Sequence, residues 1–314
     1  MAVYAFIFPG QGSQSVGMGR DLAAAFAPAR EVFEAVDETL HQKLSKLMFE
    51  GPAEELTLTA NTQPALMAHS LAVLRVLEKE GGLDLAGRAT VVAGHSLGEY
   101  SALAAAGAFS VPQAAALLRT RGQAMQAAVP PGEGGMAALL GTDMEGARAV
   151  CAEAAQGDVL ECANDNGGGQ VVISGAMAAV DRAIEVAHAK GIRRALKLPV
   201  SAPFHCALMA PAARVMAEAL AATPPAVPTV PVLANVTAAK VGDPGEIAEL
   251  LVRQVTATVR WRESVQAMVA LGVDHFVEIG AGKVLSGLVR RIAPDATATP
   301  VGTPADIEQF LATL

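Results

Sequence analysis

Short apolar runs alternate along this chain with longer stretches whose apolar residues recur at helical spacing. Val3–Phe8 is a continuous apolar run that ends at a Pro-Gly pair, and Thr90–Ala93 is a β-branched run that leads into a glycine. Continuous apolar runs of this length are typical of strands that are buried on both faces. Helical spacing is found in Asp21–Val36, in Thr62–Lys79 and, with interruptions, in Ser101–Gln126. This alternation predicts an α/β fold with a mainly parallel sheet.

The stretch between about residues 130 and 203 follows a different order. It opens with a Pro-Pro-Gly linker, and the segments after it predict the order strand, helix, strand, strand, helix, strand. These segments are Met136–Leu140, Met144–Ala155, Val159–Cys162, Gln170–Ser174, Met177–Lys190 and Ile192–Leu198. That order is typical of ferredoxin-like domains. We therefore expect residues 131–202 to form a small ferredoxin-like α+β subdomain, inserted into a larger domain of residues 1–130 and 203–314. Val232–Val236 and His275–Ile279 are expected to return to the main sheet.

Composition and charge exclude several classes of protein. Hydrophobic residues make up 52% of the chain and charged residues 17%, which is the reverse of the balance in disordered proteins. The net charge of −8 leaves no basic field for nucleic acid or an anionic membrane, so we expect neither as a partner. The longest uncharged stretch, Ser101–Leu118, is interrupted by glycine and proline and is too weakly apolar to span a bilayer.

Cysteine usage and the first residues bear on the cellular compartment. The three cysteines, Cys151, Cys162 and Cys206, are odd in number and lack the two-residue spacing of zinc or redox sites. The first residues carry no Lys or Arg before their apolar run, which argues against a signal peptide. We therefore expect a reduced, cytoplasmic protein.

Gly94-His95-Ser96-Leu97-Gly98 fits the G-x-S-x-G motif of a nucleophile elbow. It follows a predicted strand and precedes a predicted helix, which is the context that such an elbow requires. Glycines on both sides of Ser96 remove side chains that would clash in so sharp a turn, and the serine hydroxyl is left exposed. In a chain of this composition the motif arises by chance only about 0.1 times. The alternative is a glycine-rich turn whose serine merely caps the following helix.

A serine nucleophile requires a base, and His205 is the best placed of the six histidines. It lies in the predicted loop between the inserted segment and the next helix, whereas the side chain of His95 is expected to project away from its neighbour Ser96. The aspartates between serine and histidine are Asp143, Asp158, Asp165 and Asp181, all in the inserted segment. The group that orients the histidine is therefore expected not to be a carboxylate.

Two glycine clusters resemble nucleotide-binding loops only in part. After Gly10-Gln11-Gly12, the third glycine of a dinucleotide fingerprint is replaced by Ser15. The segment Gly280-Ala281-Gly282-Lys283 has Val277 and Val284 where a P-loop needs glycine and Ser or Thr. Both clusters are therefore interpreted as close packing turns.

Several motifs, in order, resemble the malonyl-CoA:acyl carrier protein transacylases. The resemblance runs from about residue 4 to about residue 290, and the motifs keep their spacing, which makes it specific. They are Phe8-Pro9-Gly10-Gln11-Gly12-Ser13-Gln14, Gly94-His95-Ser96-Leu97-Gly98-Glu99-Tyr100, Arg121-Gly122-Gln123-Ala124-Met125-Gln126, Pro203-Phe204-His205-Cys206, Val259-Arg260-Trp261 and Glu278-Ile279-Gly280-Ala281-Gly282-Lys283-Val284-Leu285. The fold that it implies is a hydrolase-like core with the inserted subdomain.

The resemblance also implies catalytic roles for five residues. Ser96 would be the acylated nucleophile and His205 its base. The backbone carbonyl of Gln254 would orient His205, which agrees with the expected absence of an aspartate. The backbone amides of Gln11 and Leu97 would form the oxyanion hole, and Leu97 directly follows the nucleophile as an elbow requires.

Three further residues are implied to bind substrate: Arg121, Met125 and Phe204. Arg121 would hold the free carboxylate of the malonyl group, because a guanidinium offers two parallel N–H donors to two carboxylate oxygens. The alternative is a solvated helix arginine like Arg119. An aromatic residue at position 204 is a weak indication of malonyl over branched acyl groups.

The implied activity is a ping-pong transfer of malonyl from malonyl-CoA to the phosphopantetheine thiol of acyl carrier protein. A malonyl-serine would be the intermediate, with no cofactor, and the chain would act as a free-standing monomer that supplies fatty acid or polyketide synthesis. Arg193, Arg194 and Lys197 could contribute a docking patch for the acidic carrier. Two alternatives remain open on the residues alone. One is a serine esterase or thioesterase, which needs water at the acyl-enzyme, and the other is a non-catalytic module that binds the carrier.

Overall fold

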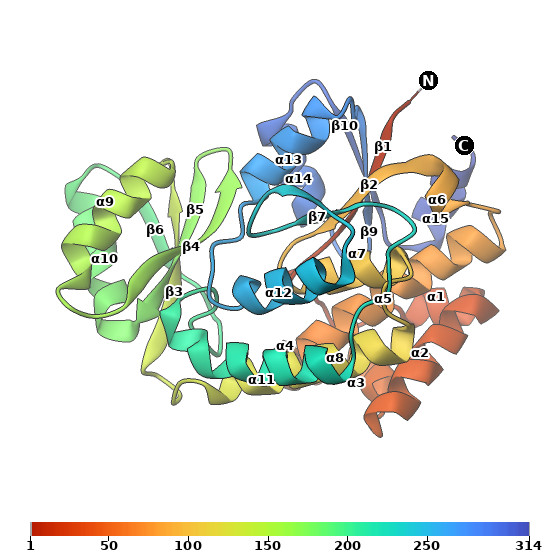
Figure 1. Ribbon diagram of the computed structural model, residues 1–314, viewed down its shortest axis with the longest axis horizontal. Coiled ribbons are helices and arrows are strands. Elements are labelled where there is room, and N and C mark those ends of the chain that lie inside the picture. Colours follow the sequence, from red (N-terminus) through yellow and green to blue (C-terminus); the bar gives the residue numbers. More distant parts are fainter. Residues whose placement is uncertain (1, 314) are drawn as a thin grey trace.

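The computed structural model describes residues 2–313 and contains two β-sheets (Figure 1). The large sheet has the strands β1 (Tyr4–Phe8), β2 (Ala89–Gly94), β7 (Val232–Ala234), β8 (Ala239–Val241), β9 (His275–Ile279) and β10 (Thr297–Val301). Their order across the sheet is β10-β9-β1-β2-β7-β8, and every neighbouring pair is parallel except β7 and β8. The expected mainly parallel α/β core is confirmed.

Helices cover both faces of the large sheet. Alternate strand residues such as Ile7 and Val91 pack with α13 (Trp261–Ala270) and α14 (Val284–Ile292) on one face. The residues between them, such as Phe6 and Val92, pack on the other face with most of the remaining helices. Those helices are α1 (Arg20–Ala25), α2 (Ala27–Leu40), α3 (Leu44–Glu50), α4 (Ala53–Thr57), α5 (Thr59–Lys79), α6 (Leu85–Arg88), α7 (Leu97–Ala105), α8 (Val111–Ala127), α11 (Ala210–Ala222), α12 (Pro244–Gln254) and α15 (Pro304–Leu311).

The small sheet lies at the left of Figure 1 and is antiparallel throughout. Its strands are β3 (Gly134–Leu140), β4 (Leu160–Gly167), β5 (Gln170–Ala176) and β6 (Arg194–Lys197), in the order β4-β5-β3-β6. Helices α9 (Met144–Ala155) and α10 (Met177–Ala189) complete the predicted order and pack on the sheet through an apolar cluster of their own. This separate cluster supports our proposal that residues 131–202 are an inserted subdomain.

Two helix predictions were wrong in detail. The predicted helix Asp21–Val36 is two helices, because Phe26 is extended and Pro28 lies in the first turn of α2, where a missing N–H costs nothing. The helix expected from Thr62 begins at Thr59, and Pro64 lies inside α5. The expected interruption near Gly107 and Pro112 is confirmed, and Ser110 starts α8 with a capping box.

The turn between β2 and α7 is as tight as the G-x-S-x-G motif predicts. Ser96 has φ 54° and ψ −111°, a conformation that L-residues rarely adopt. A Cβ on Gly98 would overlap the carbonyl oxygen of Phe8, and one on Gly94 would overlap the backbone of Gly98. The other clusters also pack closely, since a Cβ on Gly10 would lie 2.6 Å from the carbonyl oxygen of His95. This close approach supports the interpretation of the Gly10 cluster as a packing turn.

The small sheet is joined to the rest of the chain at a third place besides its two covalent connections. Strand β4 makes a parallel bridge between Asn164 and Val259. In that bridge the Asp165 N–H donates to the Val259 carbonyl at 2.9 Å, and the Val259 N–H donates to the Ala163 carbonyl at 2.8 Å. Arg262 Nη2 also lies 2.8 Å from the buried carboxylate of Asp165. These contacts fix the small sheet beside the carboxyl ends of β1 and β2.

In residues 2–313, none of the helices combines the length and the apolar character that crossing a membrane would require.

Candidate active site

A cleft of about 500 Å³ lies between the two sheets, and Ser96 is in its wall. One side is formed by residues 10–14, the loop that follows β1. The small sheet contributes Met136, Asn164, Asn166, Gln170 and Val172, and the connection that leaves this sheet contributes residues 198–200 with Phe204 and His205. The cleft therefore lies at the carboxyl ends of the parallel strands, where ligands bind in open α/β sheets.

The geometry brings together the serine and the histidine that the sequence singled out. Ser96 Oγ lies 2.8 Å from His205 Nε2. His205 Nδ1 lies 2.8 Å from the backbone carbonyl oxygen of Gln254, the last residue of α12. Because a carbonyl can only accept, Nδ1 carries the proton, and Nε2 is left to accept the proton of the serine hydroxyl. The constellation is therefore a serine and a histidine oriented by a neutral acceptor, which is chemically suited to nucleophilic catalysis.

The environment of His205 favours its neutral, basic form. Burial and, to a smaller extent, the charge of Arg121 lower the pKa of His205 to about 3, although the hydrogen bond to the Gln254 carbonyl acts in the opposite direction. His205 is 3% exposed, so protonating it in the free protein places a charge in a poorly solvated site. The imidazole is therefore available as a base well below the usual pKa of histidine.

This shift predicts how the reactivity of Ser96 depends on pH. A fluorophosphonate needs a neutral His205 but no carboxylate recognition, so its second-order rate constant with Ser96 should stay nearly constant from pH 7.5 down to pH 5.5. A histidine with the ordinary pKa of about 6.5 would instead lose about 90% of its neutral form over that interval. Intact-mass measurement of labelling against time gives the rate. A decline of about tenfold would contradict the buried, neutral base.

Arg121 is buried and contacts the nucleophile Ser96. Its side chain is 1% exposed, and its Nη2 donates to Ser96 Oγ at 3.2 Å and to Gln254 Oε1 at 2.8 Å. Nη1 donates to Gln63 Oε1 at 2.7 Å, and Nε is buried without a hydrogen-bond partner in residues 2–313. None of the ion pairs of these residues includes Arg121. A buried guanidinium with only neutral acceptors is suited to receive an anion.

The other residues predicted for the site lie in or beside the cleft. Phe204 lines it, while Met125 is buried one helical turn after Arg121 and accepts a weak hydrogen bond from Gln63. Gln11 lines the cleft and its side chain accepts from Thr59 Oγ1 at 2.9 Å. Leu97 is the first residue of α7, where backbone N–H groups are free of helical partners. Their roles in substrate binding and in an oxyanion hole stay predictions.

Sequence reasoning missed the polar residues that support these groups. Asn235 Oδ1 accepts from the Ser96 N–H at 2.8 Å, and Gln63 fixes one end of Arg121. Glu99 is buried beneath the elbow, and Asn166 Oδ1 lies 2.9 Å from His95 Nε2. The available signal was position, because Asn235 ends an apolar run at the same edge of the sheet as Ser96, and Gln63 interrupts an apolar helix.

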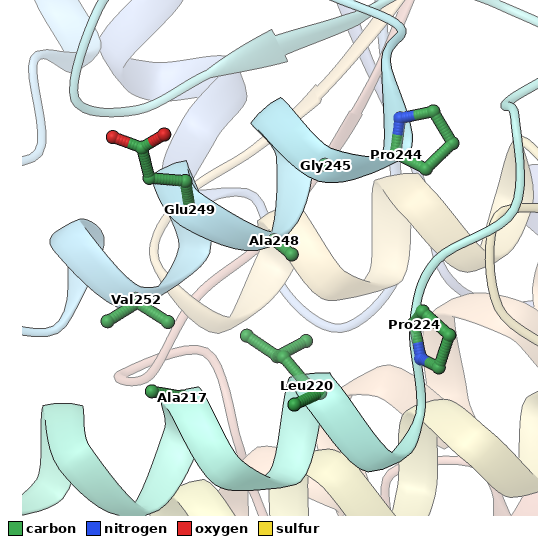
Figure 2. A pocket seen from close by; sticks show the side chains of 9 residues that line it. Ala217, Leu220, Pro224, Pro244, Gly245, Ala248, Glu249 and Val252 are labelled. Atoms are coloured by element: carbon green, nitrogen blue, oxygen red, sulfur yellow. The ribbon is translucent and has the colours of Figure 1, made fainter.

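A second groove, between α11 and α12, is shown in Figure 2 and is chemically different. It is lined mainly by small and apolar side chains, and Glu249 is the single charged residue among those that line it. Its walls contain neither a nucleophile nor a histidine. The cleft at Ser96 is therefore the candidate active site.

Comparisons with known proteins agree with this geometry. Residues 5–303 match the family described as acyl transferase domain. The malonyl CoA-acyl carrier protein transacylase of Bacillus subtilis (strain 168) is 47% identical over 315 residues, covering 100% of this chain and 98% of the relative. A solved acyl-carrier-protein-S-malonyltransferase from Bartonella henselae is 55% identical with a TM-score of 0.97, covering 99% of each chain. A structure of a type II PKS acyl-carrier protein in complex with its malonyl-transacylase matches at 42% identity and a TM-score of 0.96, covering 100% of each.

Proposed function

Since the chain belongs to the acyl transferase family, we propose that it transfers the malonyl group from malonyl-CoA to the phosphopantetheine thiol of acyl carrier protein. The transfer passes through a malonyl-serine intermediate and supplies extender units for fatty acid or polyketide synthesis. The observation that carries the proposal is the convergence of Ser96, His205 and the buried Arg121 at one cleft. The comparisons favour this reaction over the serine esterase or thioesterase that the sequence left open.

In the first half of the reaction, His205 Nε2 takes the hydroxyl proton of Ser96 as Oγ attacks the thioester carbonyl. The Gln254 carbonyl holds the imidazolium that forms. The oxyanion is bound by the backbone amides of Gln11 and Leu97, each contributing about 3–4 kcal/mol as in comparable sites. The carbon–sulfur bond then breaks, the coenzyme A thiolate leaves with the proton from His205, and malonyl-Ser96 remains.

In the second half, the same groups act in reverse. His205 takes the proton of the phosphopantetheine thiol, and the sulfur attacks the ester carbonyl of malonyl-Ser96. The same two amides bind the oxyanion, and Ser96 leaves with the proton that His205 returns. Throughout both halves Arg121 holds the malonyl carboxylate, which fixes the acyl carbon beside Ser96 and keeps one orientation for both attacks.

Mass spectrometry with purified components tests the proposal. On incubation with malonyl-CoA the protein should gain the mass of one malonyl group, and added carrier protein bearing phosphopantetheine should remove it and gain the same mass. A chain that gains no adduct would be the non-catalytic carrier-binding module. A chain that releases free malonate without loading the carrier would be a hydrolase.

Further properties belong to the same proposal. The reaction needs no cofactor, because a thioester is already activated toward a serine alkoxide. We place the enzyme in the cytoplasm, since Cys151, Cys162 and Cys206 are free thiols, and we expect it to act as a monomer. The carrier docks beside β6, where Arg193 and Arg194 are exposed, whereas Lys197 is already paired with Asp181 at 2.5 Å.

A further inference from the structure

Glu99 is a buried acid for which the reaction described above has no use. It lies in the first turn of α7, three residues after the nucleophile, and is 2% exposed. Its Oε2 accepts from the Gln254 Nε2 at 2.7 Å and from the Asn235 backbone N–H at 3.1 Å. Burying a carboxyl group is costly unless its hydrogen bonds are supplied, so its position beneath the nucleophile requires a reason.

Glu99 and the backbone carbonyl of Ser96, which accepts from the same Gln254 nitrogen at 3.0 Å, together set which way that amide faces. An amide has one accepting oxygen and one donating nitrogen, and a carboxyl acceptor at Glu99 attracts the nitrogen. The oxygen of Gln254 is then directed to Arg121, whose Nη2 it binds at 2.8 Å. In the opposite orientation the amide nitrogen would face the guanidinium, and donor would meet donor. Glu99 supplies the shorter of these two contacts, and it therefore helps to direct the Gln254 oxygen to Arg121 on the side facing Ser96.

We propose that Glu99 is a positioning residue for malonyl recognition, acting through the side chain of Gln254 to hold the guanidinium of Arg121 beside Ser96. The inference rests on the proposed function, because it assigns Arg121 to the malonyl carboxylate. Burial outweighs the opposing effects of the hydrogen bonds from Gln254 and Asn235 and of the charge of Arg121, so the pKa of Glu99 is raised to about 7. Since both protonation states keep an accepting oxygen, the positioning depends on hydrogen bonding rather than on charge.

Three variants and two substrates test this inference. The readout is the ratio of kcat/KM for malonyl-CoA to kcat/KM for acetyl-CoA, because acetyl carries no carboxylate for Arg121. Glu99→Ala should lower this ratio by at least ~10-fold, since Arg121 loses its orientation. Glu99→Gln should keep it within about threefold, because an amide oxygen replaces the accepting carboxyl oxygen. Gln254→Leu retains the backbone carbonyl and should lower the ratio as Glu99→Ala does.

The double variant Glu99→Ala/Gln254→Leu identifies the route. If Glu99 acts through Gln254, the ratio of the double variant should equal that of Gln254→Leu within about twofold. If the two residues acted independently, the losses in the two single variants would multiply. An unchanged ratio in Glu99→Ala, with both substrates slowed equally, would mean that Glu99 only supports the fold and would overturn the inference. Equal losses in Glu99→Gln and Glu99→Ala would do the same.

The two levels of the proposal fail differently. A wild-type protein that folds but does not prefer malonyl-CoA to acetyl-CoA would refute the proposed function, and the inference with it. A wild type with the preference and a Glu99→Ala variant that keeps it would refute the inference alone. Circular dichroism shows whether each variant folds. If Glu99→Ala does not fold, the ratios of Glu99→Gln and Gln254→Leu test the inference in its place.

Discussion

Ser96→Ala abolishes formation of the malonyl-enzyme and lowers malonyl transfer by about 10⁴-fold or more, as the loss of a serine nucleophile does in comparable enzymes. In the wild type Ser96 Oγ lies 2.8 Å from His205 Nε2. Once the hydroxyl is removed, His205 has no nucleophile to deprotonate. Intact mass after incubation with malonyl-CoA measures the adduct, and transfer to carrier protein measures the rate.

A matched control for this variant lies on the same helix. Ser101→Ala removes a hydroxyl that is buried in α7 without a hydrogen-bond partner in residues 2–313, so full labelling and nearly full activity are expected. A malonyl adduct on Ser96→Ala at the wild-type level would place the acylated residue elsewhere and refute the assignment of the nucleophile.

Arg121→Ala lowers kcat/KM for malonyl-CoA by about 100-fold or more, since leaving one partner of a buried ion pair alone costs about 3–5 kcal/mol. The malonyl carboxylate would face two amide oxygens, on Gln63 and Gln254, where it now meets the guanidinium. Transfer of uncharged acetyl groups should be retained or increased, because the positive charge that lowers the pKa of His205 is gone. Steady-state kinetics with both thioesters measure the two effects.

Arg119→Ala is the control for Arg121→Ala. Arg119 lies two residues earlier on α8, is only partly buried, and binds Asn61 and Gln42 away from the cleft. Its loss should leave the preference for malonyl-CoA unchanged. Arg121→Lys should fall between wild type and Arg121→Ala, because a lysine keeps the charge but not the paired donors. Unchanged malonyl kinetics in Arg121→Ala would contradict its assignment to the carboxylate.

The strands and the elbow could be predicted because their causes are local. Val3–Phe8 and Thr90–Ala93 are continuous apolar runs that end at glycine or proline. Glycine is required on both sides of Ser96 because a Cβ atom at either position would overlap neighbouring backbone atoms. The inserted β-α-β-β-α-β order could be predicted for the same reason, since each segment carries its own periodicity.

The supporting residues of the site could not be predicted in this way, because their causes lie far away in the sequence. The contact between Glu99 and Gln254 joins residues 155 positions apart, and neither residue differs in the sequence from an exposed helix residue. That Arg121 is buried rather than solvated like Arg119 is likewise decided by tertiary packing of α8 on α5. The resemblance to a family supplied Arg121 and Gln254, but not Glu99 or Asn235.

The bridge between Asn164 and Val259 has a consequence for how substrates enter. The small sheet is held to the core by two covalent connections and by this bridge, so a swing of the sheet like that of a hinged lid would break the two hydrogen bonds of the bridge. We therefore expect coenzyme A and the pantetheine arm to enter a cavity that is already formed before they bind. With such a preformed site, closing and reopening would not limit the turnover rate, which would be set by the encounter of the partners and by the chemistry of the thiol.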